Sequence, residues 1–120
     1  MTETAIIVAA RRSPIGRVGG MLHALPVEAL AAPVLAAAIG DAGIDPAEVE
    51  EVILGNAVGP GGNPARLSLL TAGLPAAVPG VTVDRQCGSG LEAVNQAARL
   101  IQAGGAAGSV LRYGLSLAGQ

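Results

Sequence analysis

Large aromatic side chains are almost absent from this chain of 120 residues. It contains no Phe, Trp or Lys, and Tyr113 is its single aromatic residue. Small aliphatic residues therefore supply most of the apolar content, which reaches 51%. Such side chains favour close packing of helices on a sheet, but each buries less apolar area than an aromatic ring. We expect a packed core of marginal stability for the isolated chain.

Charge is also scarce, at 13% of the residues with a net charge of −2. The seven arginines are scattered, and no basic stripe or series of stacking aromatics indicates a nucleic-acid partner. No apolar run is long enough to cross a membrane, and the acidic start is unlike a signal peptide. The composition therefore favours a cytoplasmic protein with no nucleic-acid or membrane partner.

The chain has one cysteine, Cys87, and one histidine, His23. A single cysteine excludes an internal disulfide and cannot build a zinc site by itself. His23 lies near the end of a glycine-rich segment without a partner close in sequence. We interpret it as a loop residue rather than as a catalytic base.

Hydrophobic runs and turn residues alternate along the first half of the chain. The apolar run 5–10 predicts a strand that is buried on both faces of a parallel or mixed sheet. Apolar residues at three- and four-residue spacing predict a helix over 27–42, capped by Gly43. Pro33 should either kink this helix or delay its start.

Capping residues define the next elements. Asp45 should cap a single helical turn, and a strand should follow over 49–57. Asn63 should cap a helix that begins with Pro64 and ends near residue 72. The expected apolar stripe of that helix consists of Leu67, Leu70 and Leu74.

The last third of the chain predicts a strand at 81–85, a helix at 91–103 and a strand at 109–117. The apolar face expected for the helix consists of Leu91, Val94, Ala97, Ala98 and Ile101. Its polar face should consist of Glu92, Asn95, Arg99 and Gln102. Alternating strands and helices indicate a layered α/β fold, without a domain boundary inside residues 1–120.

Cys87 lies at the predicted junction between the last of these strands and the helix after it. Unpaired N–H groups at a helix start favour a thiolate and can hold an oxyanion. Gly88 and Gly90 would permit a tight turn, and Ser89 could cap the helix. The alternative is a buried small hydrophobic residue, which these residues support about equally. No CxxC pair, cysteine-protease signature or phosphate-binding glycine loop is present.

The segment Val83-Asp84-Arg85-Gln86-Cys87-Gly88-Ser89-Gly90-Leu91 resembles the nucleophile motif of the thiolase family. That family comprises the acetyl-CoA acetyltransferases and 3-ketoacyl-CoA thiolases. Three further blocks agree in order and approximate spacing, so that the resemblance covers about residues 5–106. These blocks are Arg12-Ser13-Pro14-Ile15-Gly16 with Gly19-Gly20, Val52-Ile53-Leu54-Gly55-Asn56, and Gly62-Asn63-Pro64-Ala65-Arg66 leading to Ala72-Gly73-Leu74-Pro75.

The resemblance implies a thiolase-like layered αβα fold with a mixed sheet. Residues 1–120 would form most of the first of two similar halves. It also implies that Cys87 accepts an acyl group from an acyl-CoA or acetyl-CoA substrate and contributes its backbone amide to an oxyanion site. An S-acyl-cysteine intermediate would serve the formation or cleavage of 3-ketoacyl-CoA in fatty acid metabolism. Homo-oligomers are implied, whereas no metal or organic cofactor is.

The family's histidine, second cysteine and water-ordering asparagine would all lie in the second half, outside these residues. We therefore expect the 120 residues alone to be inactive, since a nucleophile needs a base and an oriented partner. Arg112 and Tyr113 also interrupt a run that is apolar in the family. The alternative is a non-catalytic thiolase-like fragment or interaction subunit.

Overall fold

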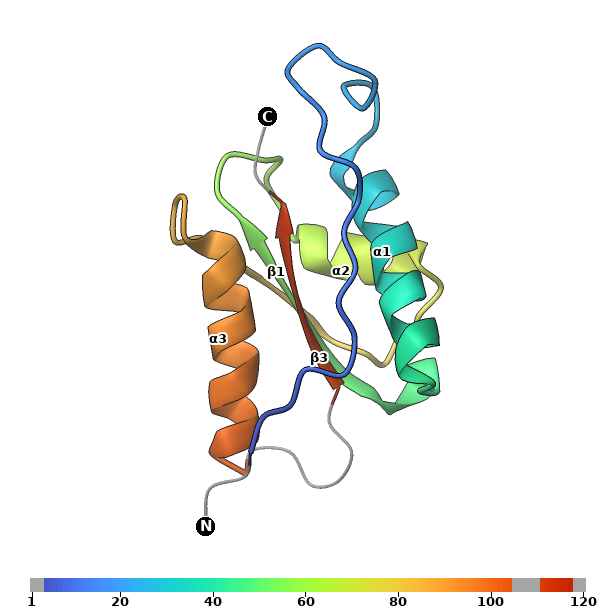
Figure 1. Ribbon diagram of the computed structural model, residues 1–120, viewed down its shortest axis with the longest axis vertical. Helices are drawn as coiled ribbons and strands as arrows, with labels where there is room; N and C mark the ends of the chain where they lie inside the picture. The colour runs from blue at the N-terminus through green and yellow to red at the C-terminus, as the bar shows by residue number, and fades with distance from the viewer. Residues whose placement is uncertain (1–3, 105–110, 118–120) are drawn as a thin grey trace.

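The computed structural model describes residues 4–104 and 111–117, the latter by their backbone. A strand–helix alternation follows the first helix, in agreement with the α/β prediction (Figure 1). The elements are α1 (Val27–Ala42), the 3-10 turn η1 (Pro46–Glu48), β1 (Val49–Asn56), α2 (Pro64–Thr71), β2 (Gly80–Val83), α3 (Ser89–Gln102) and β3 (Leu111–Leu117).

The described strands form one sheet in the order β2-β1-β3, and both pairings are parallel. Helical crossovers explain this direction, because α2 connects β1 to β2 and α3 connects β2 to β3. The mixed sheet implied by the resemblance is therefore not what these strands form. Arg112 and Tyr113 pair with Glu51 and Val52 of β1, directly after a register shift, so β3 runs through both residues.

Helices cover both faces of the sheet, which gives the expected αβα layering. Figure 1 shows α3 on one side of the sheet and α1 with α2 on the other. Val52 belongs to the cluster under α1 and α2, whereas its neighbour Ile53 packs with Ala93 and Ala97 of α3. Both strand residues are almost fully buried. A strand covered on both faces carries consecutive apolar residues, as the stretch 52–54 of β1 does.

The apolar run 5–10 is not a strand in this structure, so that prediction was wrong. The segment forms neither helix nor strand, and the Ile7 side chain is 78% exposed. In the described sheet β2 and β3 each pair only with β1, so the segment does not extend the sheet at either outer edge. The Arg11 guanidinium pairs with the Asp41 carboxylate in the last turn of α1, which directs the segment along that helix.

The first helix has the predicted bounds, and it ends at Gly43 with a left-handed φ of 67°. Pro33 lies inside the helix on its exposed side, so the helix does not begin late. The buried face contains Leu35 and Ile39, which are four residues apart as the apolar spacing requires. Sequence periodicity therefore located this helix and its core face correctly.

Asn63 is the predicted cap of α2, but of the expected apolar stripe only Leu74 lies in the core. The Asn63 side chain accepts a hydrogen bond from the Arg66 amide at 3.2 Å. Leu67 and Leu70 are exposed, whereas Leu69 is fully buried. The helix is rotated because its start lies against β2, where the Asn63 amide donates to the Gly80 carbonyl at 2.9 Å.

Candidate functional site

Cys87 lies in the short connection between β2 and α3, and it is exposed. The helix begins at Ser89 with Gly88 as its N-terminal cap residue. The predicted strand–turn–helix junction is therefore confirmed. In this chain the Cys87 side chain is accessible from solvent and is not a buried hydrophobic residue.

The residue before the cysteine has an unusual backbone conformation. Gln86 has a φ of 49°, in the left-handed region that non-glycine residues adopt only at a cost. Its N–H donates to the Asp84 carboxylate at 2.9 Å, and its carbonyl accepts from the Ser89 amide at 3.1 Å. Hydrogen bonds on both sides of Gln86 thus hold the turn that leads into Cys87.

Ser89 closes this turn rather than capping the helix, which corrects the role expected for it. Its hydroxyl donates to the Gln86 carbonyl at 2.7 Å and accepts from the Arg85 amide at 2.8 Å. The residue is 4% exposed, so little water competes for these bonds. One side chain therefore fastens two successive residues that precede Cys87.

The backbone amides after Cys87 fall into two groups. The Gly88 and Ser89 amides donate to the Arg85 and Gln86 carbonyls, at 3.0 and 3.1 Å. They are used within the turn and are not available to a ligand. The amides of Gly90 and Leu91 donate to no backbone carbonyl of the preceding turn or of another described segment. Gly90 is buried with its nitrogen against Gly55 of β1, whereas Leu91 is exposed, so Leu91 is the accessible residue whose N–H can stabilise negative charge.

Gly55 of β1 lets the start of α3 approach the central strand. A Cβ atom at this position would lie 2.5 Å from the Ser89 carbonyl carbon and 2.6 Å from the Gly90 amide nitrogen. No side chain fits in that space. The sequence placed Gly55 in a motif block without indicating this contact, which joins segments distant in the chain.

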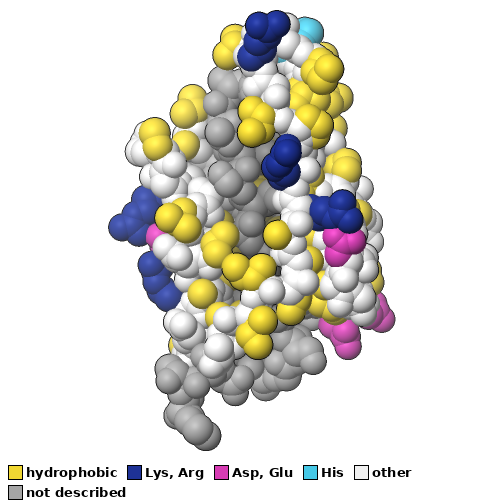
Figure 2. Space-filling model, in the orientation of Figure 1, with side chains coloured by type: hydrophobic (Ala, Val, Ile, Leu, Met, Phe, Trp, Pro, Cys, Tyr) yellow, Lys and Arg dark blue, Asp and Glu magenta, His cyan; other side chains and the backbone are white. Residues whose placement is uncertain are grey.

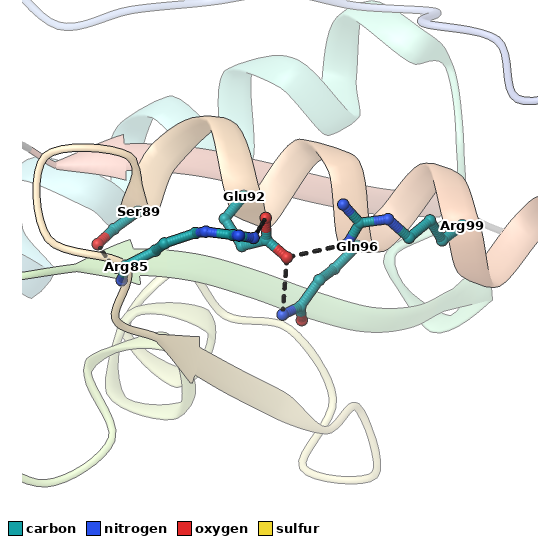
Figure 3. A network of polar contacts seen from close by, with 5 residues as sticks. All are labelled: Arg85, Ser89, Glu92, Gln96 and Arg99. Carbon is teal, nitrogen blue, oxygen red and sulfur yellow. Dashed lines mark hydrogen bonds and ion pairs between the residues drawn. The ribbon is translucent and has the colours of Figure 1, made fainter.

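Glu92 binds two arginines beside the turn, as Figure 3 shows. The Arg85 guanidinium donates to one carboxylate oxygen at 2.6 Å, and the Arg99 guanidinium donates to the other at 2.9 Å. The Gln96 amide lies 3.5 Å from the carboxylate. Sequence periodicity placed Glu92 on the solvent face, but its side chain is only 11% exposed. In the sequence, only the spacing of seven residues from Arg85 to Glu92 and from Glu92 to Arg99 could have indicated these ion pairs.

The surroundings of Glu92 favour its ionised form. The hydrogen bonds from Arg99 and from Arg85 lower the pKa of the carboxyl below its ordinary value. Partial burial opposes this shift without reversing it. The group is therefore a stable anion at neutral pH, held between two cations.

The predicted apolar face of α3 is only partly correct. Ala97 is buried as expected, together with Ala93, but Leu91 is 68% exposed. The close approach at Gly55 leaves room only for small side chains between α3 and the sheet. Figure 2 shows hydrophobic side chains spread over one face of the molecule.

His23 lies in an exposed loop, where its Nδ1 atom is 2.6 Å from the Gly20 carbonyl oxygen. This contact agrees with the interpretation of a loop histidine. Within residues 4–104 and 111–117, no group of three His, Cys, Asp or Glu side chains could hold a metal ion. In the same part of the chain, no helix combines the length and apolar character needed to cross a membrane.

Comparison with known proteins gives consistent matches. The family model described as "Thiolase, N-terminal domain" matches residues 5–115. A Bacillus subtilis (strain 168) protein named as an acetyl-CoA C-acetyltransferase, YhfS, is 55% identical over 103 residues, which cover 83% of this chain and 27% of that protein. A Staphylococcus aureus (strain COL) protein of the same designation, VraB, is 50% identical over 100 residues, or 83% of this chain and 26% of that protein.

A solved structure supports the same assignment. The crystal structure of the Bacillus anthracis acetyl-CoA acetyltransferase superposes with a TM-score of 0.82 at 46% identity. The match covers 88% of this chain and 27% of that one. The chain thus spans about a quarter of the length of the relatives it matches. From the family match over most of its length, together with these relatives, the chain belongs to the thiolase family.

Proposed function

We propose that this chain carries the nucleophile of an acetyl-CoA acyltransferase that forms or cleaves 3-ketoacyl-CoA. The observation that carries the proposal is the exposed Cys87 thiol at the start of α3. A reactive thiol must be accessible and lie close to groups that stabilise negative charge. The relatives carry names that refer to acetyl transfer from acetyl-CoA, and these names support the substrate class.

The proposed step transfers an acyl group between two sulfur atoms. The Cys87 thiolate attacks the carbonyl carbon of an acyl-CoA thioester, and the carbonyl oxygen becomes an oxyanion. When the carbonyl re-forms, the bond to the CoA sulfur breaks, and CoA leaves as a thiolate that takes up the proton lost by Cys87. The amide of the exposed residue Leu91, in the first helical turn, would stabilise negative charge at this end of α3.

Turnover would require further groups besides those of this chain. A base must remove the cysteine proton and later act on the second substrate. We place that base, and most of the CoA-binding surface, in the remaining length that the relatives possess. A homo-oligomer acting without metal or organic cofactor remains our expectation for the complete enzyme.

The proposal can be tested on the chain itself, because Cys87 is its only thiol. The rate of alkylation by iodoacetamide is measured by mass spectrometry for the folded chain and for the chain unfolded in urea. We expect the folded chain to react faster, since the exposed thiol lies beside the positive end of the α3 dipole. A Cys87→Ser variant, which should take up no label, controls for reaction elsewhere.

Incubation with acetyl-CoA provides the second measurement. Uptake of one acetyl group, absent in the Cys87→Ser variant, would support the acyl-transfer step directly. A folded chain whose Cys87 is no more reactive than in the unfolded state would refute the proposal. That result would favour the non-catalytic subunit instead.

A further inference from the structure

Arg85 is attached to α3 at both of its ends. Its backbone amide donates to the Ser89 hydroxyl at 2.8 Å, and its guanidinium donates to the Glu92 carboxylate at 2.6 Å. Cys87 lies between Arg85 and these two partners in the chain. The segment 85–92 therefore forms a closed loop around the cysteine, held by the main-chain hydrogen bonds of the turn and by one side-chain ion pair, between Arg85 and Glu92.

Burial of the Glu92 carboxylate costs free energy unless the group is paired. Its side chain is 11% exposed, on a helix whose neighbouring residue Ala93 is fully buried against the sheet. A carboxylate removed from water is stable only when it is paired and hydrogen-bonded. Arg85 and Arg99 supply that pairing from opposite sides of Glu92. Only the contact with Arg85 reaches outside the helix to the turn.

The turn needs such fastening because its backbone is strained. Gln86 adopts a φ of 49° directly after Arg85 and directly before Cys87. A non-glycine residue keeps this conformation only when its surroundings hold it there. If Arg85 were released from α3, Gln86 could relax and the thiol would lose its alignment with the helix start.

We propose that Glu92 is a positioning residue for Cys87 and that it acts through Arg85. The inference rests on the proposed role of Cys87 as the acyl acceptor. Glu92 itself makes no contact with the reacting groups in this scheme. It fixes Arg85, Arg85 fixes the turn, and the turn orients the sulfur toward the first turn of α3.

Charge and position make opposite predictions for Glu92. If Glu92 acted on Cys87 only by its negative charge, Glu92→Ala would remove a nearby anion and speed alkylation of the sulfur. If it acts by positioning, the same substitution slows alkylation even though the anion is gone. We expect Glu92→Ala to react about threefold more slowly than the unaltered chain, as for the loss of one partly exposed ion pair.

The two arginines provide a matched pair. Arg85 and Arg99 bind the same carboxylate, and their side chains are similarly exposed, at 67% and 59%. We expect Arg85→Ala to slow alkylation about as much as Glu92→Ala, and Arg99→Ala to leave it unchanged. Glu92→Gln keeps an acceptor for Arg85 and should recover part of the rate. The double variant Arg85→Ala/Glu92→Ala should react no more slowly than either single variant.

The experiment uses the 120-residue chain with iodoacetamide as the probe, across the pH range in which thiols ionise. Urea unfolding followed by far-UV circular dichroism first identifies conditions in which each variant is folded. Alkylation rates are then compared only under those conditions, so that unfolding of a variant does not alter the measured rate. Unchanged or faster alkylation of folded Glu92→Ala would overturn the inference. If that variant does not fold, equal rates for Arg85→Ala and Arg99→Ala would overturn it. A poorly reactive unaltered chain would instead refute the proposed function.

Discussion

Replacing Gly55 with alanine should push the start of α3 away from the central strand. The new methyl group would lie 2.5 Å from the Ser89 carbonyl carbon and 2.6 Å from both the Ser89 oxygen and the Gly90 nitrogen. All three atoms belong to the backbone, so no side chain can swing aside. To reach ordinary contact, the helix start or the strand must retreat by about 1 Å, which a close-packed interior resists.

The cost can be compared with known substitutions. Forcing a methyl group into a packed site costs about 1–3 kcal/mol, whereas replacing glycine by alanine elsewhere stabilises a chain by about 0.5–1 kcal/mol. We therefore expect Gly55→Ala to lower the free energy of unfolding by about 1–2 kcal/mol. Because the displaced atoms belong to Ser89 and Gly90, alkylation of Cys87 should slow as well.

Gly40→Ala is the matched control. Gly40 lies in α1 without a positive φ, and a Cβ there would meet nothing within 4 Å. This variant should be stabilised by about 0.5–1 kcal/mol. Urea unfolding followed by far-UV circular dichroism measures both changes. If Gly55→Ala were as stable as the unaltered chain, or gained stability as Gly40→Ala should, the close approach of α3 would be refuted.

Two further predictions concern helix capping and acid stability. Asn63→Ala should lower the free energy of unfolding by about 2 kcal/mol, since this side chain caps α2 and also bonds β2. Asp45→Ala should lower it by about 1 kcal/mol, because this variant loses only the cap of η1. Urea unfolding measures both changes, and equal losses would contradict the added contact of Asn63 to β2. Glu92 has a lowered pKa because of hydrogen bonds from Arg99 and Arg85, so its contribution to stability should be full above the unfolded-state pKa, about 4.3, and be lost as the pH falls through the lower folded-state value. Urea midpoints measured against pH should show this loss, and a Glu92→Gln variant with an identical acid slope would contradict it.

Sequence alone predicted the elements whose signals are local. Asn63 and Asp45 cap the helical turns that they precede, and Gly43 ends α1 in the left-handed conformation that it was expected to adopt. Each of these contacts joins residues within a few positions of one another. The same is true of the strand–turn–helix order around Cys87, which is why that junction could also be located.

Features that depend on distant segments could not be predicted. An apolar run at 5–10 has the composition of a strand, but strand formation depends on an available neighbour and not on composition alone. The buried face of α3 was misplaced for a related reason. Hydrophobic periodicity assigned Leu91 inward, whereas the contact at Gly55 selects small residues such as Ala93 for that face.

The candidate site combines both kinds of information. Local residues place a thiol at the start of a helix, which suffices to suggest a nucleophile but not to orient it. Orientation comes from Gly55, which sets the distance of α3 from β1, and from Glu92, which holds the turn through Arg85. The contact at Gly55 and the ion pair between Glu92 and Arg85 both act on the backbone at the start of α3. Substitutions at either position should therefore change the reactivity of Cys87 without touching its sulfur, and their effects should not be additive if both act by displacing the start of α3.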